Sequence, residues 1–108
     1  MFVLGHNSLQ ALSTLGKNIE IARCRRSLSK KLLCERAMIT PQTYRRLING
    51  DAGISLGVIF SVCQAMNIEV MLGEMLAPEL DEAGKALENT NRKRHFKGMP
   101  DDALDTNF

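Results

Sequence analysis

Apolar residues recur every three or four positions over most of residues 8–76, a spacing that predicts a series of amphipathic helices. The first helix is expected over about residues 8–26, capped by Asn7 or Ser8. Gly16 is a weak point at which this helix can divide in two. Its apolar stripe consists of Leu9, Leu12, Leu15, Ile19 and Ala22.

Three further helix starts share one arrangement, in which an apolar residue precedes a capping hydroxyl and a second apolar residue follows in the next turn. The predicted caps are Ser29, Thr40 and Ser55. Pro41 occupies the first helical position after Thr40, where its missing N–H costs nothing. Asn49-Gly50 predicts the end of that helix. The apolar pairs are Leu28 with Leu33, Ile39 with Tyr44, and Ile54 with Ile59.

The segment after the fourth predicted helix, Ser55–Met66, is ambiguous. Ile68, Val70 and Leu72 alternate with other residues, so a short strand near 68–72 competes with a helix continued to residue 76. From residue 77 onward charges, Pro and Gly leave little to bury, and we expect a flexible charged tail over 77–108. The fold expected over residues 8–76 is therefore an all-α, five-helix domain, with a short dimerising β-strand as one option.

The charge is unevenly distributed along the chain. Residues 17–46 contain nine Lys or Arg and two Glu, a balance of +7, whereas residues 77–108 contain five basic and seven acidic residues, a balance of −2. A basic segment suits a polyanion, although a solvated helix face explains it better when the charge is taken alone. Three Cys without a CxxC pair favour buried thiols in a reducing cytoplasm, and the short apolar N-terminus predicts no signal peptide or membrane span.

The segment Leu28–Gly50 has the layout of a helix-turn-helix, in which the second helix lies in the DNA major groove. Small residues, Cys34 and Ala37, occur where the two helices must cross. Gln42 and Arg46 are four residues apart on the outward face, and these side-chain types pair with adenine and guanine edges. The residues expected to contact phosphate are Ser29, Lys30, Lys31, Thr40, Thr43, Arg45 and Asn49.

With these residues the chain resembles the phage-repressor-like (Xre/Cro-type) helix-turn-helix family over about residues 15–72. The resemblance implies that Pro41, Gln42 and Arg46 contact bases and that Lys30 clamps a phosphate. Met38 departs from the family, which usually has Gly at this turn, and would accept an uncommon backbone angle or reshape the turn. The acidic partner of Arg23 is replaced by Ile48, which leaves Arg23 for solvent, phosphate or another acid, and Leu32 replaces the Glu of the capping box.

Within that family the chain looks most similar to HipB-like antitoxins of toxin–antitoxin operons. The resemblance comes from Ser8-Leu9-Gln10, the single helix-turn-helix, the alternating segment AMNIEVML and the terminal Phe108. It implies a cytoplasmic, nucleoid-associated bacterial homodimer, formed partly through Ile68, Val70 and Leu72, that binds operator DNA, represses its own operon and binds a HipA-like kinase toxin. The alternatives are a stand-alone phage-type regulator and a toxin-neutralising interaction module with little DNA binding.

Catalysis is not expected. The two histidines, His6 and His95, lie in flanking segments that we expect to be poorly structured. No Ser-His-Asp or Cys-His grouping and no Gly-rich phosphate loop can be assembled from the predicted helices. We therefore expect a protein that is not an enzyme and that has no cofactor and no metal site.

Overall fold

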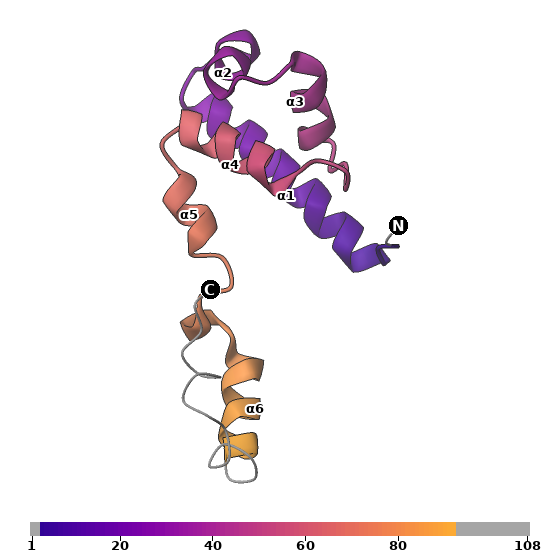
Figure 1. Ribbon diagram of the computed structural model, residues 1–108, viewed down its shortest axis with the longest axis vertical. Helices are drawn as coiled ribbons and strands as arrows, with labels where there is room; N and C mark the ends of the chain where they lie inside the picture. Colours follow the sequence, from indigo (N-terminus) through magenta and orange to yellow (C-terminus); the bar gives the residue numbers. More distant parts are fainter. Residues whose placement is uncertain (1–2, 93–108) are drawn as a thin grey trace. The chain divides into compact units, whose positions relative to one another are not determined.

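The computed structural model describes residues 3–92, and within this range the chain is all-helical, with six α-helices and one 3₁₀ turn (Figure 1). Five of the α-helices lie between residues 6 and 73, the sixth lies beyond the domain expected over residues 8–76, and no strand occurs in this part of the chain. It divides into two compact units after Gly73, three residues before the expected end of the domain. The elements are α1 (His6–Arg25), α2 (Lys30–Ala37), α3 (Pro41–Ile48), α4 (Leu56–Ala65), α5 (Glu69–Gly73), η1 (Pro78–Leu80) and α6 (Glu82–Arg92).

The three predicted hydroxyl caps are confirmed. Ser29 Oγ accepts a hydrogen bond from the Leu32 N–H at 3.0 Å, and Thr40 Oγ1 and Ser55 Oγ accept the equivalent bonds in α3 and α4 at 3.1 Å. These bonds satisfy N–H groups that have no partner inside the helix. The residues that precede the caps pack against the core, and they are Leu28, Ile39 and Ile54.

Each of α1 to α4 is followed by one residue in the left-handed backbone region. After α2 this residue is Met38, with φ 58° and ψ 44°, and the N–H of Ile39 donates to the Cys34 carbonyl at 3.0 Å. Met38 thus accepts the uncommon backbone angle, and the turn keeps the geometry that Gly usually supplies. The equivalent residues after α1, α3 and α4 are Ser27, Gly50 and Asn67.

The start of α1 differs from the prediction. The helix begins at His6, two residues before the expected start, and Gly5 is its N-cap residue without a side-chain bond. Neither Asn7 nor Ser8 caps the helix, because both lie inside its first turn. His6 is therefore helical, not part of an unstructured flank.

Gly16 does not divide α1, which is one helix of 20 residues. A Cβ at this position would lie 2.5 Å from the carbonyl oxygen of Ile48, so the missing side chain lets α3 approach α1. Gly50, with φ 78°, meets α1 in the same way, since a Cβ there would lie 2.8 Å from the Ser13 nitrogen. The two glycines mark a close contact between α1 and the end of α3.

The core of the first unit lies between α1 and the helices that follow it. Cys34 and Ala37 are buried on the inner face of α2, as predicted for the crossing point. Cys24 is exposed, so the expectation that all three thiols are buried was wrong; it lies near the end of α1, beyond the buried part of that helix. The buried hydrophobic residues are Ile19, Leu33, Cys34, Ala37, Tyr44, Leu47, Ile59, Val62, Cys63, Met66 and Leu72.

The segment near 68–72 is the short helix α5, so the predicted strand was wrong. The Ile68 N–H donates to the Cys63 carbonyl at 2.9 Å and completes the end of α4, which leaves Ile68 half-buried against the core. Leu72, four residues later and so on the same helical face as Ile68, is buried. A helix suits this spacing because it satisfies its own backbone groups, whereas a strand would need a partner strand.

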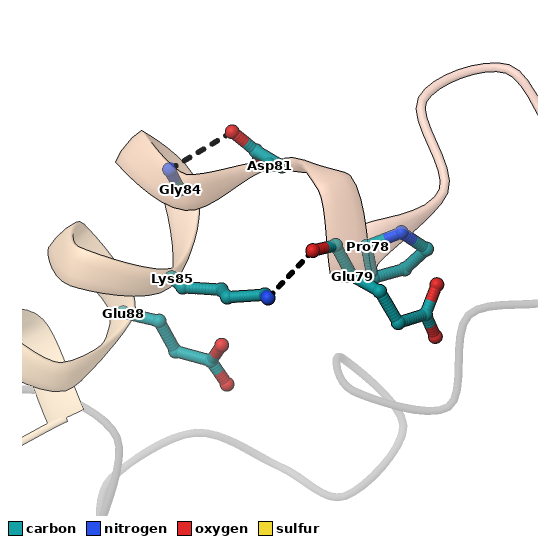
Figure 2. Close-up of a pocket in the computed structure, with 6 residues that line it drawn as sticks. All are labelled: Pro78, Glu79, Asp81, Gly84, Lys85 and Glu88. Carbon is teal, nitrogen blue, oxygen red and sulfur yellow. Dashed lines mark hydrogen bonds between the residues drawn. The ribbon is translucent and has the colours of Figure 1, made fainter.

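The second unit consists of η1 and α6 in its described part (Figure 2). Asp81 Oδ1 accepts from the Gly84 N–H at 2.9 Å, and Lys85 Nζ donates to the Glu79 carbonyl at 2.6 Å. Residues 93–108, which include most of the expected charged tail and Phe108, lie outside the described residues. None of the helices described is long and apolar enough to cross a membrane.

Candidate nucleic-acid interface

The third helix has one buried and one free face. Tyr44 and Leu47, three positions apart, are buried against the core. Gln42 and Arg46 consequently lie on the opposite side and are exposed, one helical turn apart. This is the orientation that contact with a groove of DNA requires.

A shallow hollow on this exposed face brings together most of the predicted contact residues. Pro41 does not line it; this residue lines a smaller pocket between α2 and α3 that also includes Lys30 and Arg45. Pro41 and Gln42 are therefore adjacent in sequence but border different hollows. The residues of the larger hollow are Thr40, Gln42, Thr43, Arg45, Arg46 and Asn49.

The hydroxyl groups at the start of α3 are already engaged in part. Thr40 Oγ1 accepts from the Thr43 N–H and donates to Thr43 Oγ1 at 3.0 Å. The hydroxyl proton of Thr43 is then the one that can be offered to an outside acceptor. Of the two threonines predicted to contact phosphate, Thr43 is the better placed to donate.

The start of α2 presents exposed positive charge. Lys30 and Lys31 are exposed, directly after the cap residue Ser29. Lys30 Nζ lies 4.0 Å from Glu20 Oε2, at the limit of an ion pair. Free backbone N–H groups and two cations at one helix start favour an anion such as phosphate.

Asp51 is a charged neighbour of the site that the sequence analysis did not identify. Its Oδ2 lies 2.7 Å from Arg46 Nε, and its Oδ1 accepts from the Gly53 N–H at 2.7 Å. The hydrogen bond to Asp51 raises the pKa of Arg46, and the same bond lowers the pKa of Asp51. Arg45 has no such side-chain partner within residues 3–92. The signal in the sequence for this ion pair was the spacing of Arg46 and Asp51, which four residues including Asn49-Gly50 separate.

A polar network beneath α3 fixes its position and was also missed. Glu20 of α1 accepts hydrogen bonds from Arg23 Nε at 2.9 Å and from the Tyr44 hydroxyl at 2.6 Å. Arg23 Nη1 also donates to the Leu28 carbonyl in the turn before α2. The acid that pairs with Arg23 is therefore Glu20 on the same helix. Pairing with another acid was one of the three expectations for Arg23, since Ile48 stands at the position of its usual partner. The signal was the spacing of Glu20 and Arg23, three residues apart on one helix.

The network changes the ionisation of its members. The hydrogen bond from Arg23 lowers the pKa of Glu20 from 4.5 to about 2, and its partner Tyr44 has a raised pKa because the phenol is buried. The raised pKa of Cys34, caused by burial, keeps that thiol protonated. No group of three His, Cys, Asp or Glu suited to a metal ion occurs in the described part of the chain.

Comparison with known proteins agrees with this geometry. Residues 19–71 match the family model described as Helix-turn-helix. The match begins within α1 and ends within α5, and it includes the whole exposed face of α3. Neither the curated proteins nor the solved structures gave a significant match.

Proposed function

We propose that this chain, in which residues 19–71 form an Xre/Cro-type helix-turn-helix domain, is a sequence-specific transcriptional repressor that binds double-stranded operator DNA. The observation that carries the proposal is the exposed pair Gln42 and Arg46 on the free face of α3. Both side-chain types recognise base edges in the major groove. Exposed cations at the start of α2 supply the contacts that orient such a helix on the phosphate backbone.

The proposed contacts divide between bases and phosphates. Gln42 and Arg46 contact base edges, with Pro41 beside them at the start of the helix. Arg45 suits phosphate because its guanidinium has no competing partner within residues 3–92. The remaining proposed phosphate contacts are Ser29, Lys30, Lys31, Thr40, Thr43 and Asn49.

The first prediction concerns base recognition. Duplexes selected from a random pool by the wild-type chain, at stated salt, define the specific site. Gln42→Ala and Arg46→Ala should each weaken binding to that site by about 1–3 kcal/mol and relax the base preference at one position, because a bidentate base contact is lost. Fluorescence anisotropy on the specific and on random duplexes measures both effects.

Lys30→Ala is the matched comparison for this experiment. Loss of a phosphate contact should weaken binding to specific and random duplexes alike and reduce the salt dependence. If Gln42→Ala and Arg46→Ala behave as Lys30→Ala does, these residues do not recognise bases. If the wild-type chain selects no common sequence, the proposed function itself fails.

The finer form of this proposal is a HipB-like antitoxin that represses its own operon and binds a HipA-like kinase toxin. Its support is the sequence Ser8-Leu9-Gln10, which lies just inside α1, and the single helix-turn-helix. The alternating segment no longer contributes, since it is α5 and not a strand, and Phe108 lies outside the described residues. A stand-alone regulator and a toxin-neutralising module with little DNA binding are the alternatives.

The gene adjacent to that of this chain separates these alternatives. A neighbouring kinase-like gene, with co-purification of the two products, supports the antitoxin. Binding of the toxin by a chain that has lost operator affinity through Arg46→Ala would show that neutralisation is independent of DNA. A chain that represses without any such neighbour is a stand-alone regulator.

A homodimer is part of the proposal, but the interface must differ from the one predicted. Ile68 and Leu72 face the core, whereas Val70 is 69% exposed. Of the three predicted residues, only Val70 is free to contact a second copy.

A further inference from the structure

The ion pair between Arg46 and Asp51 lies on the exposed face of α3 that we propose to enter DNA. The two side chains are 52% and 37% exposed, so the pair adds little to the stability of the fold. Its presence beside the hollow that Arg45 and Arg46 line needs a different explanation, because a carboxylate there repels the phosphate backbone.

Asp51 is hydrogen-bonded to its own loop, and it contacts Arg46 in turn. One carboxylate oxygen accepts from the Gly53 N–H at 2.7 Å, so the side chain is fixed to the backbone of the loop after α3. The other oxygen accepts from Arg46 Nε at 2.7 Å. The plane of the guanidinium is thereby set before any DNA arrives.

The contact leaves the other end of Arg46 free. With Nε engaged, the N–H groups of Nη1 and Nη2 remain available, and this parallel pair fits the O6 and N7 acceptors of guanine. Gly53 contributes space to this arrangement. A Cβ on Gly53 would lie 3.1 Å from Arg46 Nη2 and 3.1 Å from Asp51 Oδ1, so a side chain there would crowd both groups.

Arg45 shows the contrast within the same helix. It is exposed, it is adjacent in sequence, and within residues 3–92 it has no side-chain partner. A free arginine can follow a phosphate, whereas an arginine beside a fixed carboxylate gains less from a phosphate because the carboxylate repels it.

From this difference we infer that Asp51 is a positioning residue that directs Arg46 toward guanine and away from phosphate. The inference rests on the proposed function and names one base that the site recognises. Asp51 acts through Arg46, and Gly53 keeps the space that the pair requires.

The test uses the full chain and the variant Asp51→Asn. The asparagine oxygen can still accept from the Gly53 N–H, but its amide group cannot also accept from Arg46 Nε. The probe is the duplex selected by the wild-type chain, with each guanine replaced in turn by 7-deazaguanine, which lacks the N7 acceptor. Glu74→Gln, in the second unit, makes the same change in net charge and is the control.

At the guanine contacted by Arg46, 7-deazaguanine should weaken wild-type binding about tenfold. In Asp51→Asn this discrimination should fall to about threefold or less, while affinity for random duplexes rises above that of Glu74→Gln. Gly53→Ala should reduce the discrimination without a change in charge. Thermal unfolding of each variant shows whether it is folded.

Two results would overturn the inference. Either Asp51→Asn keeps the wild-type discrimination, or it weakens binding to every duplex equally, as a purely structural residue would. The failure of the proposed function looks different, because then the wild-type chain selects no common sequence and discriminates at no guanine.

Discussion

Glu20 illustrates how one side chain can determine the position of a recognition element. Its carboxylate on α1 accepts from Arg23 on the same helix and from Tyr44 on α3. The phenol of Tyr44 is in a residue only 1% exposed, so it has no alternative partner in water. Loss of the carboxylate would leave a buried hydroxyl unsatisfied, which is more costly than the bond is worth.

The ionisation of Glu20 predicts a loss of stability in acid. Its pKa is lowered from 4.5 to about 2 in the folded chain. The ionised carboxylate therefore contributes its full stabilisation to the fold above pH 4.5, and this stabilisation disappears as the pH falls from 4.5 toward 2. We expect it to be about 2–3 kcal/mol. Urea unfolding between pH 7 and pH 2.5 measures it, with Glu20→Gln expected to have a shallower pH dependence than wild type. Equal profiles for Glu20→Gln and wild type would contradict the prediction.

Met38 occupies a strained backbone position, so its replacement by glycine should stabilise the fold. It has φ 58° and is 90% exposed, so its side chain adds strain without burial. Met38→Gly should raise the free energy of unfolding by about 0.5–1 kcal/mol, since glycine adopts this region without the Cβ clash. Asn67→Gly is the control and should gain less, because asparagine tolerates the left-handed region. A lower midpoint of chemical denaturation for Met38→Gly would refute this explanation.

At the scale of helices, the position of α3 depends on its close contact with α1. The carbonyls at the end of α3 reach the backbone of α1 at Gly16, and Gly50 meets α1 one turn earlier. The polar network at Glu20 lies further along α1 and contacts the middle of α3 through Tyr44. Two sites of contact therefore fix both the distance and the direction of the proposed recognition helix.

Gly16→Ala should disrupt this close contact between α1 and α3. The added methyl group would lie 2.5 Å from the Ile48 oxygen, and backbone atoms cannot move aside easily. We expect a loss of about 1–3 kcal/mol, together with weaker operator binding as α3 shifts. Gly57→Ala, in α4, meets only Ser55 Oγ at 3.8 Å and should leave stability unchanged or raise it. Equal thermal midpoints for Gly16→Ala and wild type would show that the contact is not close in solution.

The helix boundaries could be predicted where the signal is local. The caps at Ser29, Thr40 and Ser55 depend on neighbours within three residues, so the pattern in the sequence was sufficient. Burial at Cys34 and Ala37 followed from the need for small residues where helices cross. The exposure of Gln42 and Arg46 followed from the same helical period.

The failures of prediction have a common physical cause. The bond between Tyr44 and Glu20 joins residues 24 positions apart, and no local pattern announces it. Gly16 appeared as a break because its neighbour, the end of α3, is distant in sequence. The alternation at Ile68 and Leu72 also fits a helix, since residues four apart share a face. Tertiary packing, not local preference, decided these positions.

At the scale of the whole molecule, the proposed homodimer determines how two recognition helices reach DNA. A dimer places its half-sites about 34 Å apart, one turn of the duplex. Val70→Glu should weaken self-association by placing a charge in the interface, and it should lower operator affinity because the two halves no longer bind together. Sedimentation velocity measures the association. Gln64→Glu, exposed on α4, is the control, and a Val70→Glu chain that remains dimeric would place the interface elsewhere.

The left-handed residues that follow α1 to α4 have a consequence for how the chain acquires its shape. Each one ends a helix, and after α1 and α2 the next residue but one already caps the following helix. The turns between these helices therefore involve only a few adjacent residues, and closing such short loops costs little conformational entropy. The first unit should therefore fold within about a millisecond. We expect the turns between its helices to form early and the polar network around Glu20 to form last.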